Sequence, residues 1–238
     1  MDTTQDNFLG GQVRITQPRD GYRAGIDPVM LAAAVSAKAG EAVLELGCGV
    51  GVASLCLGRR IPGLRLVGIE LQPEYAALAR DNAHVNEVAF DVHTGDLCDL
   101  PVALKSTSFD HVIMNPPYFD RNASVAAQNQ GRETALGEGT PLADWMSVGA
   151  KRLKPKGTFS MIIRTERLPD VMRNFPNSMG SLQLFPIQAR VGRASDLFIL
   201  KARKSGRAAF RLEAPIVMHD GTQHVQDGES YSAPIQAV

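Results

Sequence analysis

Short apolar segments alternate with segments of helical periodicity between about residue 28 and residue 163. Runs that are apolar throughout are typical of strands buried on both faces of a sheet, and helical spacing of apolar positions is typical of amphipathic helices. This alternation predicts an α/β fold with a doubly wound, mostly parallel sheet. A helix is expected at about 28–38, a second one after Gly51 to about Arg60, a long one from Pro73 onward and a further one at about 142–153. Strands are expected at Ala42 to Leu46, Leu64 to Ile69, Phe90 to His93, Phe109 to Met114 and Thr158 to Ile163.

Other signals mark boundaries and connections. Asp27 before Pro28 is typical of a helix N-cap with proline at the first helical position. The segment from Phe119 to Thr140 has little hydrophobic periodicity and is longer than most connections, which predicts a functional loop. Two strand-like segments, Ser181 to Ile187 and Leu197 to Ala202, precede a tail rich in proline and glycine.

The composition is that of an ordinary globular protein. Of the 238 residues, 44% are hydrophobic and 21% are charged, which argues against disorder. No apolar run approaches the roughly 20 residues that span a bilayer, and Asp2 and Asp6 stand where a signal peptide needs a basic start. We therefore expect a cytoplasmic protein without a membrane span. Cys48, Cys56 and Cys98 are too few for a disulfide framework, and the five histidines lack ligand spacing, so no metal site is expected.

The formal net charge of zero conceals a basic segment. Residues 151–211 contain 14 Lys and Arg against 3 Asp and Glu, whereas residues 1–150 contain 11 against 18. Such a block indicates contact with nucleic acid, but from charge alone a solvated surface is an equal alternative. The candidate phosphate-binding residues are Arg190, Arg193, Lys201, Arg203, Lys204 and Arg207.

A glycine-rich turn follows the first buried strand and opens a helix. Its sequence is Glu45-Leu46-Gly47-Cys48-Gly49-Val50-Gly51, at the place where α/β sheets bind nucleotide-type ligands. It lacks the third glycine of the dinucleotide fingerprint, because Val52 follows Gly51, and this argues against a dehydrogenase. Glu45 would repel a phosphate but could hold a cationic amino group, such as the ammonium of S-adenosylmethionine.

Two more acidic residues follow the next strands. Glu70 stands where a carboxylate can accept hydrogen bonds from two ribose hydroxyls, and Asp96 stands where it can meet an adenine amino group. The alternatives are that the glycines merely permit the turn and that the acids cap helices. Together the three acids and the turn favour an S-adenosylmethionine site.

The fourth strand runs into Asn115-Pro116-Pro117-Tyr118. The two prolines remove backbone donors and stiffen the chain, so the Asn115 amide and the Pro116 carbonyl can face one point as acceptors. Acceptors on both hydrogens of an adenine amino group favour a pyramidal nitrogen whose lone pair faces a methyl sulfonium. Tyr118 offers a face on which a base can stack. The alternative is an ordinary proline-rich turn with a surface tyrosine.

On these motifs, residues 25–165 resemble the class I S-adenosylmethionine-dependent methyltransferases of the NPPY amino-methyltransferase group. The segments 21–27, 131–133, 142–144 and 164–168 are also similar to bacterial tRNA adenine-N6 methyltransferases that modify the adenosine just 3′ of the anticodon. Ala24-Gly25 departs from that pattern, since relatives usually have a larger aromatic and a small polar residue there. The resemblance implies S-adenosyl-L-methionine as cofactor, tRNA as partner, and a seven-stranded Rossmann-like sheet with a small C-terminal extension.

The resemblance also implies roles for residues and regions. It implies a cap over the cofactor at 1–40, a methyltransferase core at 41–205 and a tail at 206–238 that packs on the core. Catalytic roles fall to Asn115, Pro116, Pro117 and Tyr118. The implied cofactor contacts are Tyr22, Asp27, Glu45, Leu46, Gly47, Cys48, Gly49, Gly51, Glu70, Leu71, Asp96, Leu97 and Asn115.

The function expected is methyl transfer to the exocyclic N6 of an adenine in tRNA, by a monomer or weak dimer. The second hypothesis is a glutamine-amide methyltransferase acting on a protein such as a release factor, although no extra N-terminal helical domain that would grip a protein loop is evident. A catalytically inactive cofactor-binding module is the third, and the intact Asn115 and Tyr118 argue against it.

Overall fold

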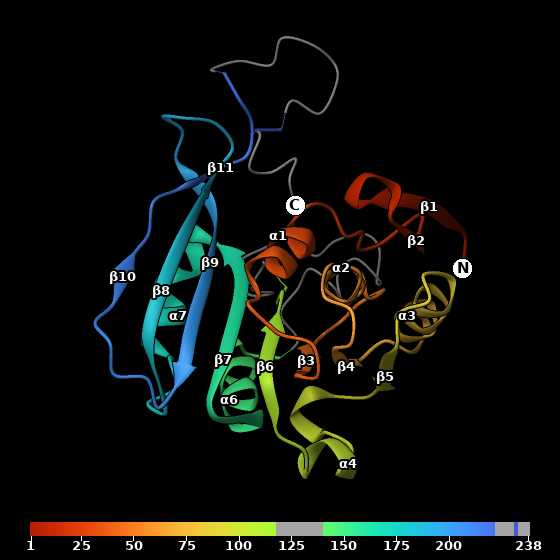
Figure 1. Ribbon diagram of the computed structural model, residues 1–238, viewed down its shortest axis with the longest axis horizontal. Coiled ribbons are helices and arrows are strands. Elements are labelled where there is room, and N and C mark those ends of the chain that lie inside the picture. The colour runs from red at the N-terminus through yellow and green to blue at the C-terminus, as the bar shows by residue number, and fades with distance from the viewer. Residues whose placement is uncertain (118–139, 222–230, 233–238) are drawn as a thin grey trace.

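In the part of the chain that the structure describes, nine strands form one central sheet (Figure 1). The computed structural model describes residues 1–117, 140–221, 231 and 232. The strand order is β10-β8-β9-β7-β6-β3-β4-β5, and β11 also pairs with β8. Only β9 runs antiparallel to its neighbours in this described sheet, which confirms the predicted mostly parallel α/β architecture. The strands are β3 (Ala42–Leu46), β4 (Arg65–Glu70), β5 (Phe90–Thr94), β6 (Phe109–Met114), β7 (Leu153–Arg164), β8 (Met179–Gln188), β9 (Ser195–Lys204), β10 (Arg211–Leu212) and β11 (Ile216–Val217).

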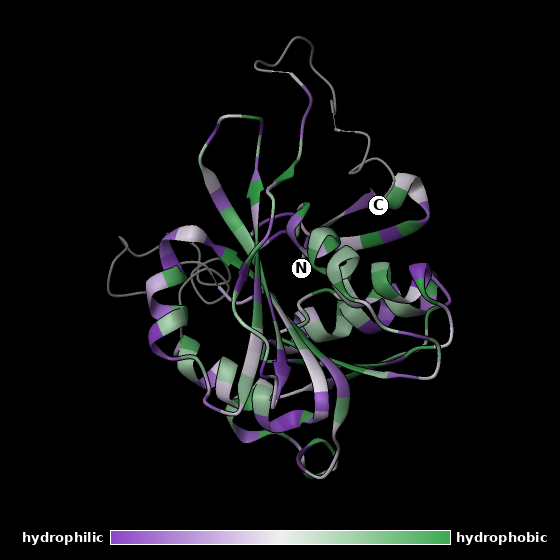
Figure 2. Cartoon of the chain, turned by 60° about the vertical axis from the view of Figure 1, so that its left-hand side comes forward, coloured by the Kyte–Doolittle hydropathy of each residue, from purple (hydrophilic) through white to green (hydrophobic). Residues whose placement is uncertain are grey.

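Helices cover both faces of the sheet, and Figure 2 shows hydrophobic residues concentrated in the strands and on the inner sides of the helices. The helices are α1 (Asp27–Ala34), α2 (Val52–Arg60), α3 (Pro73–Val85), α4 (Val102–Lys105), α6 (Leu142–Arg152) and α7 (Leu168–Arg173). Side chains of α1, α2 and α3 share one core with Val43 and Ile113, whereas α6 and α7 share the other with Leu44 and Val112. Neighbouring residues of β3 and of β6 thus enter opposite cores, as the two-residue period of a strand requires.

The chain order creates a switch point between β3 and β6. From β3 the chain continues outward through β4 and β5, and it then returns to β6 on the other side of β3. Leu46 pairs with Met114 at the carboxyl ends of these two strands. Open α/β sheets bind ligands outside such a point. The fold therefore brings the glycine turn after Leu46 next to Asn115, which follows Met114.

The hydrophobic pattern gave no indication of an N-terminal hairpin. In it, β1 (Thr3–Phe8) pairs antiparallel with β2 (Val13–Pro18). Val13 and Ile15 are fully buried, but β1 is polar and two alternating apolar residues are a weak strand signal. The hairpin packs against α2 and α3 (Figure 1).

Three predicted boundaries are wrong. Ile26, not Asp27, is the N-cap of α1, because the helix already begins at Asp27. Asp27 stands in the first helical turn instead, where its charge suits the helix dipole. The same helix ends at Ala34, because the next residue is extended, and β7 begins at Leu153 directly after α6.

The C-terminal segment extends the sheet at β8. The two-residue strands β10 and β11 both pair in parallel with β8, and the expectation of seven strands did not include them. Seven longer strands make up the rest of the described sheet. None of the helices in the described ranges combines the length and apolar character needed to cross a membrane.

Candidate active site

A cavity of about 310 Å³ lies at the carboxyl ends of β3, β4 and β6. Its wall combines the glycine turn with side chains from strand ends far apart in the sequence. The predicted site residues in this wall are Tyr22, Glu45, Gly47, Cys48, Gly49, Glu70, Leu71, Asp96, Leu97, Asn115, Pro116 and Pro117.

Two glycines of the turn have left-handed conformations that side chains rarely adopt, and Gly47 also lacks room for a side chain. Gly47 has φ +65°, and a Cβ atom there would lie 2.4 Å from Cη2 of Trp145. Gly49 has φ +54°, and its N–H donates to Oε2 of Glu70 at 2.9 Å. The turn is therefore packed against the indole ring on one side and tied to the end of β4 on the other.

Glu45 is buried at the end of β3, with 3% of its surface exposed. Its Oε2 accepts hydrogen bonds from the N–H and the hydroxyl of Ser54, at 3.1 and 2.5 Å. Burial, together with the charge of Glu70, raises the pKa of Glu45 to about 8 despite these bonds. A cation in the cavity would favour the ionised carboxylate, so the site suits an ammonium group.

Glu70 is 7% exposed, and both of its oxygens accept backbone N–H groups. Oε2 binds Gly49 and Oε1 binds Gln72, each at 2.9 Å. Burial raises the pKa of Glu70, and these hydrogen bonds oppose the shift. Each carboxylate oxygen keeps a further lone pair, so the side chain is fixed and can still accept hydrogen bonds from two hydroxyls.

Asp96 lies at a more exposed part of the wall. Its Oδ1 accepts the N–H of Cys98 at 2.8 Å and caps the short turn Leu97–Asp99. Leu97 and Leu71, which is 54% exposed, also line the cavity there. Apolar side chains beside a carboxylate suit a purine with its amino group. The helix-capping alternative is therefore correct for Asp96, which also lines the cavity, and its contact with adenine stays a prediction.

Asn115 joins the cavity to the N-terminal segment. Its Nδ2 donates to the Tyr22 hydroxyl at 3.4 Å, and its Oδ1 is buried with no hydrogen-bond partner among the described residues. The Tyr22 backbone is held in turn by Tyr75, whose hydroxyl accepts the Tyr22 N–H at 3.1 Å and donates to the Tyr22 carbonyl at 3.3 Å. Burial, with the charges of Asp27 and Glu45, raises the pKa of Tyr22, so the phenol stays protonated. The Asn115 carbonyl is left as an acceptor for an incoming N–H group.

Four predicted site residues are not among the described wall residues. Leu46 is fully buried in the sheet core, because alternate β3 positions face the helices. Gly51 is the N-cap of α2 with φ 92°, and Asp27 lies in the first turn of α1. Tyr118 lies outside the described residues.

Local sequence patterns missed several wall residues, notably Trp145, Tyr75 and Thr140. Trp145 is 8% exposed on α6, and its Nε1 has no hydrogen-bond partner in the described part of the chain. These residues belong to no motif. Only the packing of α3 and α6 against the strand ends brings Tyr75 and Trp145 to the cavity.

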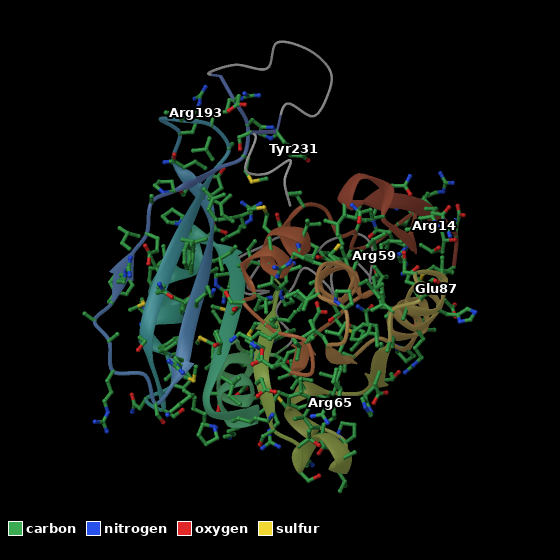
Figure 3. The ribbon with its side chains drawn as sticks, viewed as in Figure 1. Arg14, Arg59, Arg65, Glu87, Arg193 and Tyr231 are labelled. Carbon is green, nitrogen blue, oxygen red and sulfur yellow. The ribbon has the colours of Figure 1, made fainter. Side chains whose placement is uncertain are left out.

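Two of the predicted phosphate-binding residues lie at the carboxyl ends of the parallel strands, the same side of the sheet as the cavity. Arg190 and Arg193 belong to the turn between β8 and β9, and Figure 3 shows Arg193 at its tip. At this end, Leu197 near the start of β9 pairs with Arg164 at the end of β7. Arg190 donates to the carbonyl of Asp220, which ties the turn to the C-terminal segment.

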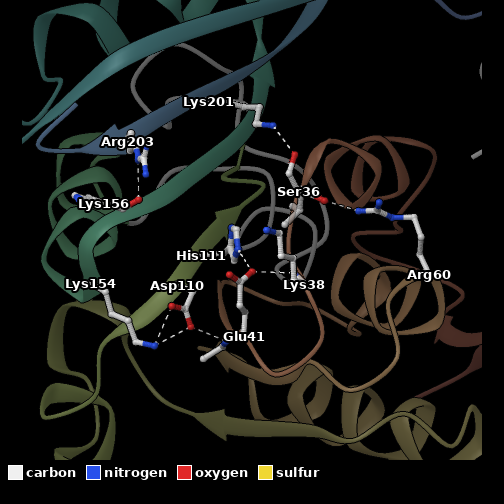
Figure 4. Close-up of polar contacts among 12 residues, drawn as sticks. Ser36, Lys38, Glu41, Arg60, Asp110, His111, Lys154, Lys156, Lys201 and Arg203 are labelled. Carbon is white, nitrogen blue, oxygen red and sulfur yellow. Dashed lines mark hydrogen bonds and ion pairs between the residues drawn. The ribbon is translucent and has the colours of Figure 1, made fainter. Parts of the chain in front are cut away.

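Other predicted phosphate-binding residues lie at the opposite ends of the strands, away from the cavity. Arg203 pairs with Thr158 on β7, and its Nε donates to the Lys156 carbonyl at 3.0 Å (Figure 4). Lys204 donates to the Leu153 carbonyl at 2.7 Å. Because a strand rises about 3.3 Å per residue, Arg203 lies about 20 Å along β9 from the end near the cavity. The predicted phosphate-binding residues therefore form two separate groups instead of one continuous basic surface.

Lys201 has a different role from the one predicted. Its Nζ donates to the Ala34 carbonyl at 2.8 Å and to the Ser36 hydroxyl at 3.3 Å, so it caps the C-terminus of α1 (Figure 4). Burial lowers the pKa of Lys201. Arg207 is exposed and follows β9 at the end remote from the cavity.

The sheet order, the glycine turn, the strand-end acids and the Asn-Pro-Pro segment at the switch point define a class I S-adenosylmethionine-dependent methyltransferase. Residues 25–175 match the methyltransferase small domain family, and the chain belongs to this family. It is a methyltransferase enzyme, and S-adenosyl-L-methionine is its cofactor.

Named relatives share most of the chain. A Porphyromonas gingivalis protein named tRNA1(Val) (adenine(37)-N6)-methyltransferase is 31% identical over 175 residues, which cover 70% of this chain and 68% of the relative. A Haemophilus influenzae protein of the same name is 29% identical over 162 residues, or 67% of this chain and 68% of the relative.

Solved structures support the fold. A predicted O-methyltransferase from Agrobacterium tumefaciens superposes with a TM-score of 0.69 at 23% identity, covering 88% of this chain and 93% of that chain. The type I restriction-modification system methyltransferase subunit from Streptococcus thermophilus gives 0.62 at 17% identity, covering 91% of this chain and 51% of that chain.

Proposed function

We propose that this protein transfers a methyl group to the exocyclic N6 of an adenine in tRNA. The relatives named above support tRNA as the substrate class. The observation that carries the proposal is the buried Oδ1 of Asn115, an acceptor without a described partner at the rim of the cofactor cavity. An amino group that enters this cavity would supply the missing N–H donor. A tRNA substrate also supports the expected cytoplasmic location.

The protein groups hold the reacting amine rather than deprotonate it in advance; S-adenosylhomocysteine would be the leaving group, and the methylated N6 would then lose one proton to solvent water. S-adenosylmethionine, when bound, supplies an electrophilic methyl group on a sulfonium. Asn115 Oδ1 accepts one N6 hydrogen and the Pro116 carbonyl accepts the other, which favours a pyramidal nitrogen whose lone pair is no longer delocalised into the ring. Tyr22 holds the Asn115 amide, and Tyr118 stacks on the base. None of these groups requires a metal ion, so we propose a metal-independent reaction.

Glutamine-amide methylation is the competing activity, because a glutamine amide also presents an N–H₂ group. The names of the relatives favour adenine. We further propose that tRNA approaches across the turn between β8 and β9, because Arg193 is exposed on the same side of the sheet as the cavity. Arg203, Lys204 and Arg207 contribute little to this contact because they lie at the opposite ends of the strands.

The decisive experiment transfers a tritiated methyl group to total tRNA, total rRNA and total protein from cells that lack the gene. We expect label in tRNA, and nuclease digestion with mass spectrometry should identify N6-methyladenosine. The same assay with chelator should give the same yield. Label confined to protein as N-methylglutamine would contradict the tRNA proposal, and label in rRNA alone would replace its substrate.

A further inference from the structure

One side of α3 (Pro73–Val85), continued by its C-cap residue Asn86, carries three buried polar side chains. Tyr75, Asn82 and Asn86 are separated by seven and four residues, a spacing that places them along one side of a helix. They are 3%, 1% and 4% exposed, so each needs a hydrogen-bond partner inside the protein. Their partners lie in the N-terminal segment, which packs along α3 (Figure 3).

The two asparagines bind the free edge of β2 as a further strand would. Asn82 Oδ1 accepts the Thr16 N–H at 2.8 Å, and its Nδ2 donates to the Thr16 carbonyl at 3.0 Å. Asn86 makes the same pair of bonds with Arg14, at 2.8 and 2.6 Å. Four helical residues rise about 6 Å and two strand residues rise about 6.8 Å, so the two spacings match. Each amide supplies the donor and the acceptor that a neighbouring strand would supply.

The remaining contact distinguishes the two asparagines. Asn82 Nδ2 also donates to the Val50 carbonyl at 3.0 Å, whereas Asn86, the C-cap of α3, donates from its Nδ2 to the Asn82 carbonyl at 2.7 Å. Val50 belongs to the glycine turn and lines the cavity. A single amide group at Asn82 therefore joins the hairpin, α3 and the cofactor turn.

We propose that Asn82 is a positioning residue that couples docking of the N-terminal hairpin to the affinity for S-adenosylmethionine. The inference rests on the cofactor assignment made above. The bond from Asn82 to the Val50 carbonyl fixes the glycine turn. Gly49, the preceding residue of that turn, donates its N–H to Glu70 and so orients this carboxylate. Coupling between two sites is reciprocal, so cofactor binding must also strengthen the attachment of β2 through Asn82.

A matched pair of variants tests the coupling. Asn82→Asp and Asn86→Asp each bury a carboxyl and each remove two donated hydrogen bonds, but only the first breaks the bond to Val50. We expect calorimetry to show that Asn82→Asp raises the cofactor Kd about three- to tenfold, the effect of one hydrogen bond. Asn86→Asp should lower thermal stability similarly and change the Kd less than about twofold. Equal Kd changes in both variants, or none in either, would overturn the proposal.

Amide hydrogen exchange on the wild-type protein tests it without any variant. Saturating S-adenosylmethionine should slow exchange of the Thr16 N–H, which is bonded to Asn82, more than exchange of the Arg14 N–H, which is bonded to Asn86. Equal protection of the two amides would overturn the coupling while leaving the cofactor assignment intact. Failure of the wild-type protein to bind the cofactor would overturn both.

Discussion

The amide nitrogen of Asn115 lies 3.4 Å from the Tyr22 hydroxyl, although 93 residues separate the two in the chain. In the structure the amide nitrogen of Asn115 faces the Tyr22 hydroxyl, and this orientation leaves the carbonyl oxygen without a partner among the described residues. The orientation is stable because Tyr22 itself is fixed through its backbone by Tyr75. Tyr22, which was predicted as a cofactor contact, therefore also positions Asn115.

Tyr22→Phe should lower turnover while leaving the fold intact. Without the hydroxyl, the Asn115 amide is free to rotate, and we expect kcat to fall about three- to tenfold, as for the loss of one hydrogen bond. Steady-state methylation with saturating cofactor and tRNA measures this. Tyr231→Phe is the control, because Tyr231 stacks on His219 away from the cavity. An unchanged kcat in the Tyr22 variant would remove its positioning role.

Asn115→Ala should have a larger effect on chemistry than on binding. The acceptor is needed most as the adenine nitrogen becomes pyramidal, so turnover should fall at least about a hundredfold. The Kd values for cofactor and tRNA should stay close to wild type, and Asn7→Ala, an exposed β1 substitution, should have wild-type activity. Substantial activity in Asn115→Ala would contradict the amino-methyltransferase mechanism.

Glu45 makes cofactor affinity and stability respond oppositely to pH. Its pKa rises from the ordinary 4.5 to about 8 in the folded protein. Folding therefore favours the neutral acid: its contribution to stability is complete below about pH 4.5 and is lost as the pH rises toward 8. An ammonium ligand selects the ionised carboxylate, so affinity should rise by up to about tenfold per pH unit below that pKa.

Calorimetry and thermal unfolding at pH 6, 7 and 8 measure these two trends. Glu45→Gln should flatten both of them and weaken cofactor binding at pH 8. A Kd that stays constant over this pH range in the wild-type protein would mean that the ammonium group binds elsewhere.

The divided basic residues predict which charge matters for RNA. Arg193→Glu should reduce the slope of log affinity against log salt by about 0.9 for each phosphate that the arginine neutralises in the wild-type complex. Arg207→Glu is a matched control, because both arginines are exposed and they lie near opposite ends of the strands. Filter binding over a salt series measures the slopes. Equal slopes for the two variants would mean that Arg193 is a solvated surface residue without a phosphate contact.

Periodicity predicted the strands and helices of the core because a sheet covered on both faces leaves strongly apolar segments. β6 was predicted with its observed bounds, and the Asn-Pro-Pro segment was predicted at its end. The hairpin was missed because β1 is polar and because two of its partners, Asn82 and Asn86, are side-chain amides 66 and 72 residues away that leave no local pattern.

The basic segment was misjudged for a different reason. Arg193 and Arg203 are close in sequence, but Arg193 precedes the ten-residue strand β9 and Arg203 lies near its carboxyl end. The two side chains therefore lie near opposite ends of the strands. Charge counts along a sequence cannot register that separation. Nor do they reveal that Lys201 is already bound to the end of α1.

The close contact between Trp145 and Gly47 gives this protein an internal optical probe. Trp145 is the single tryptophan of the chain, and its ring lies against the glycine turn in the cavity wall. Tryptophan fluorescence therefore arises from one place, in the wall of the cavity. Occupation of the cavity can be followed by the emission of the unlabelled enzyme, and each variant described above can be titrated in the same way.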